Sequence, residues 1–195
     1  MTPDGAAGGP AAGGPAAGTP AAGRVLVLAC GERSRGDDAA ALVAADRLLA
    51  ADDGHALGVD LQAGRPGVEI RLVGQLEPDD LAAVGPEVRV LVLDAVRGIP
   101  PGAILHRSLA DLASSGPGPR SSHMLPLRDV LGLVAVLRGG LPDGSFVGLG
   151  GESFELGAPL SPAVRQALPA FVDAVGEEID RLGAAGGPVG GSAAT

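Results

Sequence analysis

The sequence predicts an α/β protein of three layers, in which a mostly parallel sheet of about five strands is flanked by helices on both faces. Two observations indicate this class. Short apolar runs of strand length alternate with longer segments whose apolar residues recur at helical spacing. The central apolar runs have no polar face, which is typical of parallel strands, because helices cover both sides of a parallel sheet.

The first strand is the clearest. The run VLVLAC predicts a buried strand over residues 25–30. A polar turn, GERSRG, follows it and ends in two carboxylates, Asp37 and Asp38. Either carboxylate can cap the next helix, whose apolar residues share one face as far as Ala51.

The alternation then continues to the end of the domain. Further strands are predicted at 68–73, 88–94, 103–107 and 145–149, and further helices at 78–84, 126–137 and 161–182. The strand at 68–73 is expected near a sheet edge, because its apolar residues alternate with charged ones. The last helix has the strongest start signal, since Ser161 can cap it and Pro162 fits its first turn.

Length and composition predict one domain with two tails. Of the 195 residues 46% are apolar, which is ample for a single core. Residues 1–23 are almost entirely Ala, Gly and Pro, so we expect them to be disordered. The folded domain is then expected at 24–183, a common size, followed by a flexible tail at 184–195.

Charge and cysteine content exclude several classes of function. The net charge of −9 argues against nucleic acid and against anionic membranes as partners, because both require a basic surface. A single cysteine, Cys30, rules out an internal disulfide and fits a reducing compartment. The chain has no apolar run of membrane-spanning length and no secretion signal pattern, so a cytoplasmic location is expected.

Three polar residues stand where α/β proteins build their sites, at the carboxyl ends of strands. Asp38 opens the first helix, Asp94 ends VRVLVLD, and His123 precedes the helix at 126–137. Because the carboxyl ends of parallel strands meet at one edge, these groups are expected to converge. Two carboxylates and an imidazole suit a borderline or hard divalent metal ion.

Each of these residues also has a structural interpretation. Asp38 is as consistent with a helix cap as with a metal ligand, and His123 can simply cap its helix. For Asp94 the functional interpretation is favoured, because a buried carboxylate is costly without a partner and no helix that it could cap follows it. The other histidines, His55 and His106, stand among polar residues and are expected to be solvated.

Two other chemistries are less consistent with the residues. Cys30 could act as a nucleophile, but a free cysteine in an apolar strand is usually a small core residue. The turn GERSRG is not a dinucleotide-binding loop, since it lacks the second close glycine and Glu32 would face a phosphate with like charge.

Taken in order, these segments resemble the hydrogenase maturation endopeptidase family, whose members trim a C-terminal extension from the large subunit of nickel–iron hydrogenases. The family pattern GN-x-x-x-x-D, followed by Asp or Glu, is matched by GERSRGDD, and the Asp of its middle strand by VLVLDAV. The pattern S-x-H-x-L-x-L-x-D-V-L is matched by SSHMLPLRDVL, and a late strand, turn and helix by FVGLGGESFELGAPLSPAVRQAL. The resemblance covers nearly all of residues 24–182.

The resemblance implies a role for the three residues. In the family the corresponding side chains form the metal-binding and catalytic set, which falls here on Asp38, Asp94 and His123. The metal would be nickel that arrives with the substrate, with cadmium or zinc as possible substitutes. Peptide hydrolysis would use the metal to polarise the carbonyl or to activate water. The implied enzyme is a metal-dependent, nickel-recognising endopeptidase of aspartic type, expected to be a monomer, whose partner is a hydrogenase large-subunit precursor.

The chain departs from the family at two places. Glu32 replaces the usual Asn after the first glycine, and VGQLEPDDL replaces a glycine- and threonine-rich loop. An added carboxylate at Glu32 would either join the site or raise a neighbour's pKa, and Glu152 is similarly ambiguous. These departures leave an alternative open: a non-catalytic member of the same fold that binds a metal or a partner during hydrogenase assembly.

Overall fold

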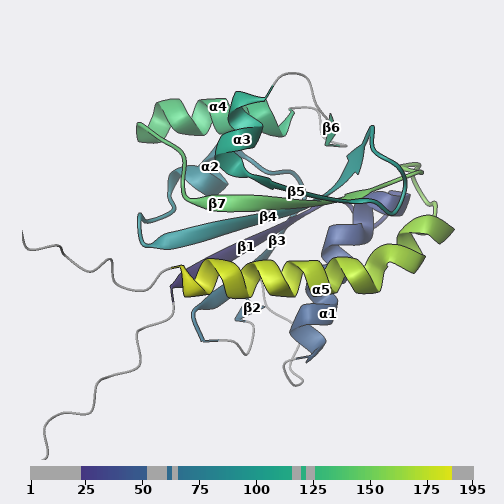
Figure 1. Ribbon diagram of the computed structural model, residues 1–195. Coiled ribbons are helices and arrows are strands. Elements are labelled where there is room, and N and C mark those ends of the chain that lie inside the picture. Colours follow the sequence, from purple (N-terminus) through teal and green to yellow (C-terminus); the bar gives the residue numbers. More distant parts are fainter. Residues whose placement is uncertain (1–22, 52–60, 63–65, 116–119, 122–125, 186–195) are drawn as a thin grey trace, which may run out of the picture.

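The computed structural model describes residues 23–51, 61–62, 66–115, 120–121 and 126–185. Their strands form one sheet in the order β2-β3-β1-β4-β7-β5, with β6 paired to β4 (Figure 1). The strands are β1 (Arg24–Cys30), β2 (Leu61–Gln62), β3 (Val68–Val73), β4 (Val88–Arg97), β5 (Ile104–Ser108), β6 (Arg120–Ser121) and β7 (Gly144–Gly150). The helices are a 3-10 turn η1 (Gly36–Ala39), α1 (Ala40–Ala51), α2 (Pro78–Ala82), α3 (Leu109–Ser114), α4 (Leu127–Arg138) and α5 (Pro162–Ala184).

The centre of the sheet is parallel, as predicted. Strand β1 pairs in parallel with β3 and β4, and β4 pairs in parallel with β7. Strand β5 is antiparallel to β7, while the two-residue strands β2 and β6 are antiparallel additions. Aside from those two short strands, the sheet has the five strands that the apolar runs predicted.

Helices cover both faces of this sheet and divide the core in two. In Figure 1, α2, α3 and α4 lie above the sheet, and α1 and α5 lie below it. Alternate residues of β1 enter the two cores: Val27 and Ala29 pack on the side of α1 and α5, whereas Leu28 and Cys30 pack on the side of α2 and α4. This arrangement confirms the predicted three-layer class and explains why the strand has no polar face.

Strand β4 is longer than predicted. It continues beyond Asp94 to Arg97, because Ala95 and Val96 still pair with β7 and Val96 also pairs with β6. Asp94 therefore lies inside the strand, which corrects the expectation that it ends it. The apolar pattern marks only where a strand is buried; pairing with neighbours decides where it stops.

Two helical features also differ from the prediction. The first helix begins with one turn of 3-10 helix, η1, before α1 starts at Ala40. Helix α3 was not predicted, because six residues are too few to show a helical period. Its start is nevertheless defined by Ser108, whose hydroxyl accepts a hydrogen bond from the Asp111 amide at 3.0 Å.

Helix α5 begins as its sequence predicts. The hydroxyl of Ser161 accepts a hydrogen bond from the Val164 amide at 3.3 Å, and Pro162 occupies the first helical position. None of the helices in the described ranges combines the length and apolarity that crossing a bilayer requires. Most of both predicted tails lies outside the described residues, so the tails stay predictions.

Candidate active site at the carboxyl ends of the strands

A glycine shapes the turn that leaves β1. Gly31 has a φ of 134°, a backbone conformation that residues with a side chain rarely adopt. A Cβ atom at this position would lie 2.0 Å from the backbone oxygen of Asp38. Only glycine therefore allows the segment GERSRGDD to fold back closely, so that Asp38 lies against the end of the strand.

Asp38 is held by its own turn. Its side chain is buried, and Oδ2 accepts a hydrogen bond from the Glu32 amide at 3.1 Å. Asp38 does not occupy an N-cap position, because it is the third residue of η1. A buried carboxylate that is oriented by a backbone amide is a suitable ligand for a metal ion or a catalytic group.

Asp94 is buried on the neighbouring strand. It is 3% exposed, and its Oδ1 accepts a hydrogen bond from the amide of Ala95 at 2.8 Å. Beside it on β7 stands Gly148, which has no side chain. A Cβ atom at Gly148 would lie 2.7 Å from the ring of Phe146, so this ring already occupies the adjacent space.

Cys30 lies close to Asp94 in the sheet, and the charges of both carboxylates act on its thiol. In the parallel register, Ala29 of β1 stands opposite Leu93 of β4, so Cys30 and Asp94 are the next residues on each strand. Burial raises the pKa of the Cys30 thiol well above its usual value, and the charges of Asp94, Asp80 and Asp38 raise it further. A thiol in this environment stays protonated, which argues against a nucleophilic role for Cys30.

Asp37 does not cap the adjacent helix but holds a distant loop. Its buried carboxylate accepts three backbone hydrogen bonds: at Oδ2 from Glu152 (2.8 Å) and Ser153 (3.0 Å), and at Oδ1 from Ser161 (2.6 Å). Its own amide donates to the Ser153 oxygen at 2.8 Å. The expected cap by Asp37 is therefore wrong. Its partners are 115 to 124 residues away, a separation at which sequence spacing carries no signal.

Glu32 interacts with its own turn. Its carboxylate accepts hydrogen bonds from the Ser34 amide at 3.2 Å and the Ser34 hydroxyl at 3.0 Å. These hydrogen bonds lower the pKa of Glu32. The side chain is exposed and binds Ser34 of the same turn, so Glu32 stabilises the turn that positions Asp38.

His123, the third predicted ligand, lies outside the described residues, as does His55. The structure thus places Asp38 and Asp94 in one region and leaves the imidazole as a prediction. Within the part of the chain that the structure describes, no three His, Cys, Asp or Glu side chains form a group that could hold a metal ion.

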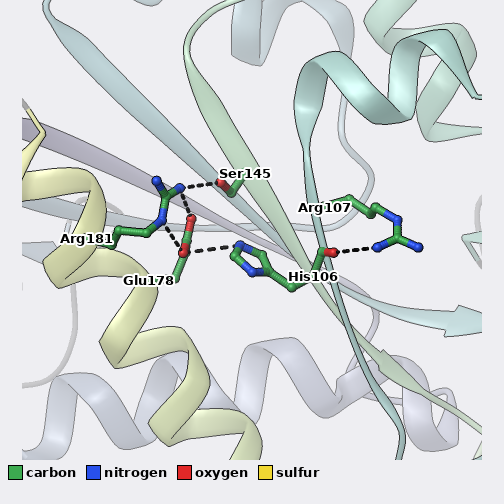
Figure 2. Close-up of polar contacts among 5 residues, drawn as sticks. All are labelled: His106, Arg107, Ser145, Glu178 and Arg181. Carbon is green, nitrogen blue, oxygen red and sulfur yellow. Dashed lines mark hydrogen bonds and ion pairs between the residues drawn. The ribbon is translucent and has the colours of Figure 1, made fainter.

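The remaining histidine belongs to a different cluster, at the start of β7 (Figure 2). His106, which is half-exposed, places Nε2 at 3.2 Å from the buried carboxylate of Glu178. Arg181 Nε donates to Glu178 at 2.8 Å, and Arg181 Nη2 donates to Ser145 at 3.0 Å. Burial alone would raise the pKa of Glu178, but the hydrogen bonds from Arg181 and Ser145 and the nearby His106 lower it to about 2. His106 is exposed, as its polar neighbours predicted, but its contact with the buried Glu178 was not predicted.

The fold and the two buried carboxylates define the class: an α/β protein with an acidic site at the carboxyl ends of its parallel strands. Several solved structures with this fold are hydrogenase maturation proteases, so the predicted resemblance is confirmed over most of the chain. No model of a known protein family matches the sequence, and no curated protein is similar to it at a significant level.

Three of these solved structures illustrate the likeness. The NiFe hydrogenase maturation protease HybD from Thermococcus kodakarensis is 27% identical, with a TM-score of 0.53 over 79% of this chain and 97% of that one. The hydrogenase 2 maturation peptidase of a Thaumarchaeota archaeon is 26% identical, with a TM-score of 0.51 over 79% and 96%. The hydrogenase maturating endopeptidase HybD from E. coli is 23% identical, with a TM-score of 0.59 over 78% and 89%, and shows the fold alone.

Proposed function

We propose that this protein is an endopeptidase that removes the C-terminal extension of a nickel–iron hydrogenase large-subunit precursor after recognising the nickel bound to that precursor. The observation that carries the proposal is the burial of Asp38 and Asp94 together, at the strand ends of a fold shared with hydrogenase maturation proteases. Nickel belongs to the substrate in this proposal and is not a resident cofactor.

The chemistry of the residues supports this role. Carboxylate oxygens and an imidazole nitrogen are acceptable nickel ligands, and His123 would supply the nitrogen. Asp38 is oriented by the Glu32 amide and Asp94 by the Ala95 amide, so each carboxylate has one oxygen held in place by the backbone. Three protein ligands leave coordination positions for the ligands that the substrate itself provides.

Hydrolysis then follows the general logic of metal-assisted cleavage. The substrate's nickel supplies Lewis acidity, which polarises the scissile carbonyl. The carboxylates of Asp38 and Asp94 fix the position of the bond and can accept the proton that the attacking water loses. The protonated thiol of Cys30 takes no part in this scheme.

The test is cleavage of a nickel-loaded large-subunit precursor, measured as the mass lost from the precursor. Asp38→Asn and Asp94→Asn each remove one negative charge without changing the shape of the side chain. We expect each to lower the cleavage rate by roughly 100-fold or more, because each removes a group that holds the reacting centre. Asp143→Asn is the control, because the Asp143 side chain is 81% exposed and lies just before the amino end of β7, away from the carboxyl ends of the strands.

Cleavage retained at the wild-type rate in both variants would contradict the proposal. Thermal unfolding of each variant should be measured beside the kinetics, so that a folding defect is recognised.

A second candidate function is the non-catalytic one, in which the protein binds a metal or a partner. One observation favours it: the segment that departs from the family includes the start of helix α2, and the charge of Asp80 in this helix raises the pKa of the Cys30 thiol, as the charges of Asp38 and Asp94 do. Nickel or cadmium binding by calorimetry, without precursor cleavage, would establish that alternative.

A further inference from the structure

We propose that the loop at 151–160, which joins β7 to α5, is the precursor-recognition surface of this site, with Leu156 as its apolar contact. Asp37 is then the positioning residue that holds the loop beside Asp38. This inference rests on the proposed function and deepens it, because it names where on the protein an extended peptide of the precursor binds. The loop lies at the carboxyl end of β7, next to the start of α1 (Figure 1).

The loop is held from one side by Asp37. The three amides that donate to its carboxylate come from the two ends of the loop, Glu152 and Ser153 at the beginning and Ser161 just after its end. One buried charge therefore closes the loop across its base. Hydrogen bonds to a charged group are stronger than those between neutral groups, so this closure is firm.

Further contacts fix the loop against the turn at 31–36 and against the end of β4. Gly36 donates to the Ala158 oxygen at 3.1 Å, and a Cβ atom at Gly36 would lie 2.6 Å from the Ser153 oxygen. The guanidinium carbon of Arg97 lies 3.9 Å from the centre of the Phe154 ring, a favourable cation–π distance. Both ends of the loop are thus fixed by packing as well as by hydrogen bonds.

The tip of the loop contacts the turn that carries Asp38. The Gly157 amide donates to the backbone oxygen of Ser34 at 2.6 Å. Ser34 in turn binds the carboxylate of Glu32, whose amide donates to Asp38. Leu156, which precedes Gly157, therefore lies beside the turn that positions Asp38.

Leu156 itself is exposed. It is 80% accessible, although its loop is firmly held on both sides. A loop whose backbone is fixed by a buried carboxylate and which nevertheless presents a large apolar side chain to solvent is preorganised for contact with a partner. The partner is a peptide of the precursor with an apolar side chain at the contact point, because the loop contacts the turn that holds Asp38, one of the carboxylates proposed to act on that precursor.

A second exposed apolar surface provides the matched comparison. The outer face of α4 carries Leu133, Val136 and Leu137, which are 49%, 81% and 64% exposed. Leu137 is thus the same residue type as Leu156 at similar exposure, but it stands near the end of α4 on the α2–α4 side of the sheet. A recognition role for α4 is one of the outcomes that the experiment separates.

The experiment measures kcat and KM for a nickel-loaded large-subunit precursor, together with binding of that precursor to immobilised enzyme. Leu156→Ser is expected to raise KM by roughly 10-fold with kcat within about twofold, because it removes one apolar contact made in the bound state. Leu156→Met should restore the wild-type KM, and Leu137→Ser should leave both constants unchanged.

The outcomes distinguish the inference from the proposed function. Normal cleavage by Leu156→Ser overturns the inference, and a raised KM in Leu137→Ser assigns recognition to α4 instead. If the wild-type protein binds the precursor without cleaving it, the endopeptidase proposal fails, whereas weaker binding by Leu156→Ser still supports the loop. If the wild-type protein neither binds nor cleaves the precursor, both proposals fall.

The role of Asp37 is tested by hydrogen exchange. In Asp37→Asn, the amide group of the new side chain would face at least one backbone N–H donor, so the loop loses part of its closure. We expect faster exchange at the amides of Glu152, Ser153 and Ser161, together with a raised KM. Unchanged exchange in a folded Asp37→Asn protein would show that Asp37 does not position the loop.

Discussion

At the scale of single residues, the site depends on a glycine and on two adjacent carboxylates that have different roles. Gly31 allows the turn to approach the backbone of Asp38, and Asp38 is then held by the Glu32 amide. Asp37, one residue earlier, has its carboxylate occupied by three amides of another segment. Adjacent residues of the same type thus differ in function, because the 3-10 turn directs their side chains to different neighbours.

Gly31→Ala is the substitution that tests the turn. The new Cβ atom would overlap the Asp38 oxygen at 2.0 Å in a φ region that alanine avoids. We expect a loss of unfolding free energy of about 3 kcal/mol or more and a loss of precursor cleavage, measured by denaturant titration and by mass. Gly132→Ala is the control: a Cβ atom there meets no neighbour within 4 Å, and alanine favours the helix, so stability should rise slightly.

At the scale of elements, α5 and the loop before it are coupled through Ser161. Its hydroxyl caps the helix by accepting from Val164, and its amide donates to Asp37. The start of the longest helix and the closure of the proposed recognition loop are therefore fixed at one residue.

Ser161→Ala separates these two functions, because it removes the hydroxyl and keeps the amide. We expect a loss of about 1 kcal/mol of unfolding free energy, the usual value of a helix cap, with little change in KM. Denaturant titration and precursor kinetics measure the two quantities. A large rise in KM, with only a small loss of stability, would show that the cap itself is needed to shape the loop.

At the scale of the whole molecule, the polar groups at the carboxyl ends of the strands and those at the opposite ends have different roles. The carboxylates at the carboxyl ends form the candidate active site, whereas the cluster around Glu178 joins α5 to β5 and β7 at the opposite end of β7 (Figure 2). This cluster links three elements that the chain order separates, so its contribution is to overall stability.

The cluster predicts an acid-sensitive term in stability. The pKa of Glu178 is about 2 in the folded protein, below its usual value of 4.5, so the unfolded chain binds the proton more readily. The stabilisation is therefore complete above about pH 5 and is lost as the pH falls toward 2. Between about pH 5 and pH 3 the wild-type protein should lose roughly 1–2 kcal/mol more than Glu178→Gln, with allowance for the exposed partners Arg181 and His106. Equal slopes in denaturant titrations would contradict this role.

The sequence by itself determined the fold class and most element positions. Apolar periodicity and helix caps depend on near neighbours along the chain, so β1, β3, β7 and α5 lie within about two residues of their predicted bounds. The same local patterns selected Asp38 and Asp94, because a buried carboxylate beside an apolar strand is conspicuous in the sequence.

Only the tertiary structure decided which groups meet. The extension of β4 past Asp94 depends on pairing with β6 and β7. The role of Asp37 in holding the loop depends on backbone amides more than 100 residues away. The Glu178–His106 pair likewise joins a helix to an edge strand. Such contacts have no local signature, since they are set by the path of the chain through space, which the order of residues specifies only through the complete fold.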